Sequence, residues 1–382
     1  MNQMPLTKSW KKARLQDLVF FQRGFDITQA QQTDGPFPVI SSSGVTSYHN
    51  ECRAPGPGVV IGRKGTLGSV HFCDVDYWPH DTTLWSKDLR GNNARFVYFY
   101  LKTIDFKRFD VGNSNPTLNR NHIHDLRILI PPRDVQDHIA GILSAYDDLS
   151  ELNRRRMVLL EEAARQLYRE WFVRLRFPGH EHTRITNGVP DGWDSSTAYS
   201  AMEVLSGGTP KTAVTDYWDG EIPFYTPKDA SDTSYVLQTE RSITELGLKS
   251  CNSKLYATNT VFISARGTVG KLNLASHAMA MSQSCYALIG KGHVSQLFLF
   301  CALKEAIEHF KQHAVGAVFD AIVVDTFKLI PFIVPSERNI LLFEEIVAPI
   351  FRQVANLMEQ NEKLGAARDL LLPRLMNGEI PV

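Results

Sequence analysis

The chain carries the same short pattern twice, and this repetition constrains its fold more than any other feature. Gly-Thr-Leu-Gly at residues 65–68 is followed 202 residues later by Gly-Thr-Val-Gly at residues 267–270. Each motif is flanked by apolar, β-branched runs, which predict a strand, a glycine-bracketed turn and a second strand. A proline-terminated apolar run at residues 129–132 also returns at residues 332–335. The sequence therefore predicts two copies of one unit.

A heptad pattern follows each copy. Apolar residues at steps of three and four are typical of a helix–helix seam, and each pattern extends over about 35 residues, or about 50 Å of helix. Two unrelated amphipathic surface helices are the alternative, which the equal length and matching order of the two patterns disfavour. The seam residues are Tyr146, Leu149, Asn153, Met157, Leu160, Ala164, Leu167 and Trp171 in the first helix, and Ile350, Val354, Leu357, Asn361, Leu364, Ala367, Leu371 and Leu375 in the second.

Two long helices separated by a compact domain can pair with each other or with another chain, and antiparallel pairing within the chain is the simpler arrangement. If Asn153 lies opposite Asn361, Leu160 aligns with Val354. The same register aligns Trp171 with residue 343, a phenylalanine. Both seams then stay apolar, and the two buried amides satisfy each other and fix the register.

These patterns predict an α+β fold with a pseudo-twofold internal repeat. Two mixed α/β globular domains occupy residues 1–133 and 193–335, and two long helical regions, at residues 134–176 and 336–382, form an antiparallel coiled coil. Residues 177–192 are rich in glycine and proline and form a linker.

Composition narrows the function. The 41 basic residues balance 41 acidic residues, so the cations of any DNA-binding surface must be placed locally. None of the five cysteines forms a Cys-x-x-Cys pair, and no stretch resembles a secretion signal or a membrane span. We expect a soluble, cytoplasmic protein.

No catalytic motif is visible. The nearest approach to a phosphate-binding loop has Ala265 in place of its first glycine and Leu272 in place of its hydroxyl residue. Residues 115–117 lack the second proline of an adenine methyltransferase motif, and the His-x-His pairs at residues 122–124 and 180–182 lack further ligands at metal-binding spacing. We therefore predict no catalytic residue, no metal site and no cofactor in this chain.

Polar and basic side chains in turns beside strands suit DNA instead. Arginine reads guanine and asparagine reads adenine by paired hydrogen bonds in the major groove, while lysine and hydroxyl side chains hold phosphate. Taken singly, each of these turn residues is more simply interpreted as a solvated surface residue. Their occurrence in both copies, each followed by a long helix, favours DNA binding. The candidates are Arg63, Lys64, Thr66, Asn113, Asn115, Asn119 and Arg120 in the first copy, and Lys211, Thr212, Lys228, Asp229, Arg266 and Thr268 in the second.

At these motifs the chain resembles the specificity subunits of type I restriction-modification enzymes, and the resemblance covers nearly its whole length. The residues that carry it are 62–68, 81–83, 130–132, Trp171 with Phe172, 207–210, 222–229, 371–375 and 378–380. The resemblance implies that each globular domain is a target-recognition domain reading one half of a split DNA site, and that the coiled coil sets the distance between the halves.

The resemblance also implies partners. Two modification subunits that use S-adenosylmethionine to methylate adenine would dock on the helical regions, and two motor-nuclease subunits that use ATP and Mg²⁺ would join for cleavage. This chain would be noncatalytic. Two alternatives remain open: a specificity subunit for a fused methyltransferase-nuclease, and a coiled-coil adaptor whose globular domains bind protein.

Overall fold

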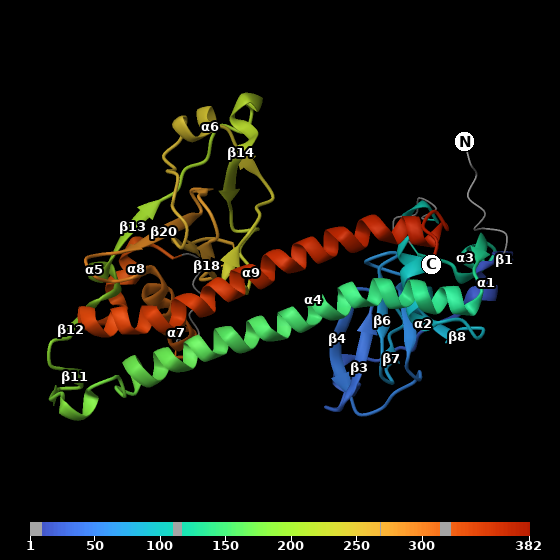
Figure 1. The fold of residues 1–382 in the computed structure, drawn as a ribbon, viewed down its shortest axis with the longest axis horizontal. Coiled ribbons are helices and arrows are strands. Elements are labelled where there is room, and N and C mark those ends of the chain that lie inside the picture. Colours follow the sequence, from blue (N-terminus) through green and yellow to red (C-terminus); the bar gives the residue numbers. More distant parts are fainter. Residues whose placement is uncertain (1–9, 110–116, 268, 314–321) are drawn as a thin grey trace. The chain divides into compact units, whose positions relative to one another are not determined.

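A computed structural model describes residues 10–109, 117–267, 269–313 and 322–382. The chain divides into two compact units. Unit 1 comprises residues 1–151 and 362–382, and unit 2 comprises residues 152–361. Each of the two long helices, α4 (Arg133–Tyr168) and α9 (Glu337–Met376), contributes one part to each unit (Figure 1).

Unit 1 is built on a four-stranded antiparallel sheet in the order β2-β8-β5-β6, beside a smaller sheet in the order β4-β3-β7. Strand β5 is Gly-Val-Val-Ile-Gly and is buried at every position, because helix α2 packs on it. The strands are β1 (Lys11–Arg14), β2 (Phe20–Arg23), β3 (Phe37–Ser41), β4 (Gly44–His49), β5 (Gly58–Gly62), β6 (Val70–Cys73), β7 (Trp78–Pro79), β8 (Thr83–Asp88) and β9 (Arg127–Ile130), and the helices are α1 (Leu15–Leu18), η2 (Gln29–Gln31), α2 (Ala94–Lys102), η3 (Phe106–Phe109) and α3 (Arg120–His124).

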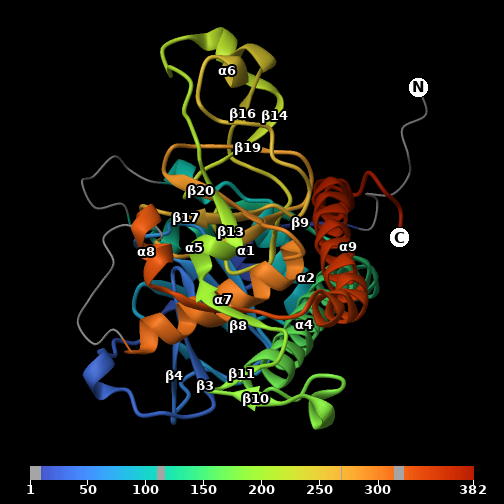
Figure 2. The same ribbon diagram turned by 90° about the vertical axis from the view of Figure 1, so that its left-hand side faces the viewer.

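Unit 2 repeats this plan with an added edge strand. Its main sheet has the order β13-β20-β17-β18-β15, its smaller sheet has the order β16-β14-β19, and helix α7 packs on the main sheet (Figure 2). The strands are β12 (Asp194–Thr197), β13 (Met202–Ser206), β14 (Trp218–Tyr225), β15 (Tyr235–Val236), β16 (Ser242–Ile243), β17 (Val261–Ser264), β18 (Leu272–Ala275), β19 (Ala280–Met281), β20 (Cys285–Gly290) and β21 (Pro331–Val334), and the helices are α5 (Ala198–Ala201), η6 (Thr215–Tyr217), α6 (Glu245–Lys249), α7 (Gln296–His313) and α8 (Val324–Leu329).

The ends of each globular part are joined in the same way. The first strand of unit 1, β1, pairs antiparallel with β9, which leads into α4. In unit 2, β12 pairs antiparallel with β21, which leads into α9. The predicted repeat is therefore a repeat of topology.

Helix α4 ends in a π-helical turn, η4 (Arg169–Val173), and the linker between the copies contains a short helix η5 (His180–His182) and a hairpin of β10 (Ile185–Thr186) and β11 (Val189–Pro190). Asn187 and Gly188 form the hairpin turn, with φ angles of 51° and 80°. Two consecutive positive φ angles favour an Asn-Gly pair in a two-residue hairpin.

Within unit 2 the two long helices pair antiparallel in the predicted register. The side-chain amide of Asn153 donates to Asn361 Oδ1 at 3.0 Å. The rings of Trp171 and Phe343 lie 6.1 Å apart, and Leu160 packs against the cluster that contains buried Val354. Leu357 is buried and Leu167 packs on the same cluster, as the predicted register requires.

Within unit 1 the same two helices continue the seam. Ile139 and Leu143 of α4 share a buried cluster with Leu375 of α9, and Leu371 packs against it. Asp147 accepts a hydrogen bond from the guanidinium of Arg368 across the helix pair. Leu364 is half-buried.

One seam prediction is wrong. Leu149 is 43% exposed, and its neighbour Ser150 takes the buried position. Steps of three and four that alternate strictly through Tyr146 and Asn153 pass through position 150, so the backbone geometry overrides the apolar character of the leucine.

Among the described residues, none of the helices combines the length and apolarity that crossing a bilayer requires.

Candidate nucleic-acid interfaces

The glycine turn of unit 1 is fixed to two neighbouring segments. Gly65 and Gly68 both have a φ of 74°, which glycine adopts at little cost, and the Gly68 N–H donates to the Gly62 carbonyl at 2.8 Å. The Arg63 N–H donates to the Thr82 carbonyl at 2.8 Å, and the Arg63 carbonyl accepts from the N–H of residue 118 at 3.0 Å. The turn is therefore held beside the segment that precedes β8 and the segment that precedes α3.

Three of the predicted residues lie on this turn. Lys64 is half-buried and its N–H also donates to the Thr82 carbonyl, at 3.1 Å, while Thr66 is exposed. Arg63 is half-buried, and its Nη1 is buried without a hydrogen-bond partner in the part of the chain that the structure describes. Burial lowers the pKa of Arg63, the positive charge of Arg23 lowers it further, and Asp81 opposes the change.

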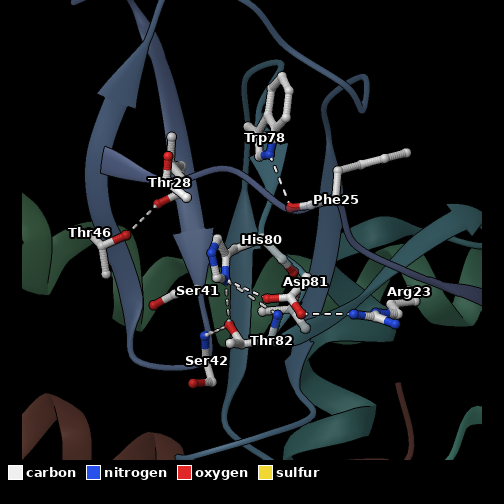
Figure 3. Close-up of polar contacts among 12 residues, drawn as sticks. Arg23, Phe25, Thr28, Ser41, Ser42, Thr46, Trp78, His80, Asp81 and Thr82 are labelled. Carbon is white, nitrogen blue, oxygen red and sulfur yellow. Dashed lines mark hydrogen bonds and ion pairs between the residues drawn. The ribbon is translucent and has the colours of Figure 1, made fainter. Parts of the chain in front are cut away.

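Asp81 is the centre of a polar cluster beside the turn. Its carboxylate accepts a hydrogen bond from Arg23 Nη2 at 2.9 Å and lies 3.3 Å from His80 Nδ1. The same His80 nitrogen lies 3.0 Å from Thr82 Oγ1. Figure 3 shows these four side chains pointing toward one another. Arg23 comes from the end of β2, and His80, Asp81 and Thr82 come from the connection between β7 and β8.

Arg23 and Asp81 of this cluster line a cleft of about 650 Å³. Arg53 lies with its guanidinium 5.0 Å from the centre of the Trp78 ring, a cation–π contact that holds it in the cleft. Trp78 in turn donates its indole N–H to the carbonyl of Phe25 at 3.3 Å. The lining residues are Gln22, Arg23, Gly24, Phe25, Asp26, Arg53, Trp78, Asp81 and Arg120.

Asp26 and Asp81 of the cleft lie close enough to His80 for the three to share a metal ion. The guanidinium of Arg23 already pairs with Asp81, and Arg53 and Arg120 line the same cleft. A divalent cation would therefore compete with three arginines, and the set carries no metal assignment.

The loop candidates of unit 1 divide into two groups. Arg120 lines the cleft, and Asn119 precedes it as the cap of α3, with its side-chain oxygen accepting the N–H of residue 121 at 3.0 Å. Asn113 and Asn115 lie outside the described residues.

The turn of unit 2 repeats the backbone of the first with different side chains. The Gly270 N–H donates to the Ser264 carbonyl at 2.9 Å, and the Ala265 N–H donates to the Ser284 carbonyl at 2.9 Å. The Ala265 carbonyl accepts from the N–H of residue 322 at 2.9 Å. Ala265 therefore occupies the place of Arg63, and exposed Arg266 occupies the place of Lys64.

The remaining candidates of unit 2 lie on its surface or support its turns. Lys211 and Thr212 are exposed, and Thr268 lies outside the described residues. Lys228 is exposed and lies 3.3 Å from the carboxylate of residue 240. Asp229 accepts hydrogen bonds from the N–H and hydroxyl of Thr226 at 2.8 and 2.7 Å, so its carboxylate is occupied in holding the turn.

Sequence reasoning missed most of the cleft. Arg23, Arg53 and Trp78 were not among the candidates, because they come from three segments that tertiary contacts bring to the glycine turn. A local signal existed only for Asp81, within the motif at residues 81–83.

Comparison with known proteins gives the same family for both halves. The family model for the type I restriction modification DNA specificity domain matches residues 7–162 and again residues 190–364. The specificity subunit of the type I restriction enzyme HindI from Haemophilus influenzae is 23% identical, covering 69% of this chain and 71% of that protein. The specificity subunit of MjaIX from Methanocaldococcus jannaschii is also 23% identical, covering 76% of this chain and 70% of that protein.

A solved structure has the same fold. The S subunit of a type I restriction-modification system from M. genitalium superimposes with a TM-score of 0.62 at 15% identity, covering 96% of each chain.

Proposed function

Because this chain belongs to the family of type I restriction modification DNA specificity proteins, we propose that each of its two units reads one half of a bipartite site in double-stranded DNA. The observation that carries the proposal is the repeated turn: the same three backbone hydrogen bonds hold a glycine-bracketed loop in both units, with different side chains. Two domains that recognise different base sequences need the same backbone to place the turn and different side chains to contact the bases.

The coiled coil supports a spacing role. Helices α4 and α9 contain 36 and 40 residues, and at about 1.5 Å per residue each has a length of about 50 to 60 Å. Half-sites about one helical turn of DNA apart, about 34 to 36 Å, are within reach of such a rod. We propose that the helix pair sets this distance.

We propose that methylation and cleavage are carried out by partners. Two modification subunits with S-adenosylmethionine and two motor-nuclease subunits with ATP and Mg²⁺ would complete the complex, and this subunit would contribute no catalytic group. Val158 and Leu159 of α4 support docking of a partner, because they are 63% and 70% exposed although they are apolar. Neighbouring apolar residues on a surface helix are typical of a protein interface.

A cytoplasmic location follows from this role, since the substrate is DNA. The five cysteines, none in a disulfide, agree with a reducing compartment.

The test is coexpression with the cognate modification subunit, followed by mapping of methylated adenines across a genome. We expect one asymmetric, two-part sequence with a fixed spacer, and no methylation when either subunit is expressed alone. Methylation without this chain, or methyl transfer by this chain alone, would overturn the proposal.

Two further measurements separate the alternatives. A partner gene that encodes a fused methyltransferase and nuclease would identify the other class of complex. A protein-binding adaptor would show little dependence of DNA affinity on salt, whereas counterion release makes the affinity of a DNA reader fall steeply as salt increases.

A further inference from the structure

We propose that Arg23 reads guanine in the half-site of unit 1 and that Asp81 is the positioning residue that holds Arg23 in place. This inference deepens the proposed function and rests on it. Neither residue belongs to the glycine turn, and the inference is carried by their pairing in the cleft beside it.

The pair is arranged for contact with a ligand. Arg23 is 55% exposed, while Asp81 is only 18% exposed, so the carboxylate forms the base of the pair and the guanidinium forms its outer end. Asp81 uses one donor of Arg23, at Nη2. A guanidinium has five N–H donors, so the rest remain available for a paired contact. Fixing the side chain in advance lowers the conformational entropy lost on binding.

The donors and acceptors of the cleft match a base edge better than phosphate. Arg23, Arg53 and Arg120 line it together with Asp26 and Asp81. Phosphate offers only acceptors, so it would give neither carboxylate a hydrogen-bond donor. In the major groove a G·C pair offers two acceptors on guanine, and arginine can donate to both of them. The amino group of cytosine is a donor, and a carboxylate can accept its hydrogen bond. A cleft with both kinds of group matches the G·C pair.

Arg63 of the glycine turn is held beside this pair, because its N–H donates to the carbonyl of Thr82, the residue after Asp81. Burial and the positive charge of Arg23 lower the pKa of Arg63, and Asp81 opposes that change. Asp81 therefore pairs with Arg23 and acts to raise the pKa of Arg63, whose Nη1 is buried without a partner among the described residues.

Unit 2 lacks this arrangement at the matching positions. Arg23 pairs with residue 84 in the β2–β8 ladder. Residue 286 lies 202 positions after residue 84 and pairs with Ser206 in the β13–β20 ladder, so Ser206 is the counterpart of Arg23. By the same offset Gln283 stands in the place of Asp81. The Arg–Asp pair is therefore specific to unit 1, as expected of a residue that selects sequence and not of one that maintains the fold.

The experiment uses the full chain coexpressed with its modification subunit, with methylation mapping and competition binding between the mapped site and single-base variants of it. The variants are Arg23→Ala, Arg23→Lys, Asp81→Asn and the double variant Arg23→Ala/Asp81→Asn. The matched control is Arg14→Ala, because Arg14 forms a similar exposed pair with Asp125, also at 2.9 Å, elsewhere in unit 1.

We expect Arg23→Ala to reduce discrimination at one G·C position of one half-site by about 5- to 150-fold and to leave the other half-site unchanged. Arg23→Lys should lose the same discrimination, because lysine keeps the charge but not the planar fork. Asp81→Asn should show a smaller loss, and the double variant should match Arg23→Ala, because Asp81 acts through Arg23.

Three results would overturn the inference. Full discrimination in Arg23→Ala would remove Arg23 from the interface. Restoration by lysine, with equal weakening on all sequences in the alanine variant, would make it a phosphate contact. Additive losses in the double variant would remove the positioning role of Asp81. If the wild-type chain directs no two-part methylation, the proposed function itself fails, which is a different outcome.

Discussion

The two glycine turns share a backbone and differ in charge. In unit 1 the turn carries Arg63 and lies beside Arg23 and Asp81, whereas the matching positions of unit 2 are Ala265, Ser206 and Gln283. The three hydrogen bonds that both turns share join main-chain atoms only, so these bonds persist when the side chains of the turn differ. The backbone of the turn is therefore common to both units, and the two units differ there in a few side chains.

Exchange of a whole globular part is the strongest test of this comparison. Replacing residues 191–335 with the matching segment of a related protein should change the half-site of unit 2 completely and leave the other half-site and the spacer unaltered, because neither unit 1 nor the seam register is touched. Specific sites typically exceed non-specific DNA by about 10³-fold or more in affinity, so the methylation map should change without ambiguity. A folded, assembled hybrid that alters both halves would contradict independent reading.

A charged residue placed in the helix seam should have the next largest effect. It should lower the free energy of unfolding by different amounts in the two units. Leu160→Asp places a carboxylate against the apolar cluster of unit 2 and should lower the free energy of unfolding by about 2 to 4 kcal/mol. Leu364→Asp in unit 1 should lower it by about 1 to 2 kcal/mol, because the register places half-buried Leu364 opposite the polar Ser150, whereas Leu160, which is also half-buried, lies opposite the apolar Val354. Thermal unfolding measures both.

Leu159→Asp is the control for the seam. Leu159 is 70% exposed, so stability should change by no more than about 0.5 kcal/mol, while assembly with the modification subunit should weaken if α4 is the docking surface. Equal destabilisation by Leu159→Asp and Leu160→Asp would mean that the seam is not where we place it.

Removal of the turn arginines should separate base reading from phosphate binding. Arg63→Ala should weaken binding to the mapped site by about 1 to 3 kcal/mol and relax one position of it. Arg266→Ala, at the exposed position that matches Lys64, should weaken binding to all sequences alike and reduce the slope of log affinity against log salt by about 1. Binding titrations at several salt concentrations measure both effects. If the two variants show the same loss of specificity and the same dependence of affinity on salt, the proposed difference between the two turns is wrong.

The smallest expected effect is a pH dependence in unit 1. Buried His124 accepts the N–H of Phe21 through Nε2 at 3.0 Å. Burial lowers the pKa of His124, and the positive charge of Arg120 lowers it further. The unfolded chain therefore takes up this proton first, so stability is retained above pH of about 6.5 and falls as the pH drops below it.

The matched variant is His124→Gln, whose side-chain oxygen can accept the same N–H without titrating. Unfolding measured between pH 8 and pH 5.5 should show a shallower decline for the variant. An unchanged slope would assign the decline to other groups.

Periodic features could be predicted from the sequence because they depend on neighbours along the chain. The repeat, the two long helices and the pairing of Asn153 with Asn361 all follow from spacing, since a heptad pattern fixes the seam once one polar pair sets the register. The prediction for Leu149 is wrong because it follows the apolar character of the residue. Strict alternation of steps of three and four places Ser150, and not Leu149, in the buried seam.

The cleft of unit 1 was decided by tertiary structure alone. Arg23 ends β2, Arg53 lies between β4 and β5, and Asp81 lies between β7 and β8, so sheet pairing and loop packing bring together residues that are 28 to 58 positions apart. No period in the sequence relates them, and each alone resembles a solvated charge. The sequence by itself determined where the two globular repeats and the two long helices lie along the chain. Only the three-dimensional packing determined which charges meet in the cleft, because electrostatic contact depends on distance in space.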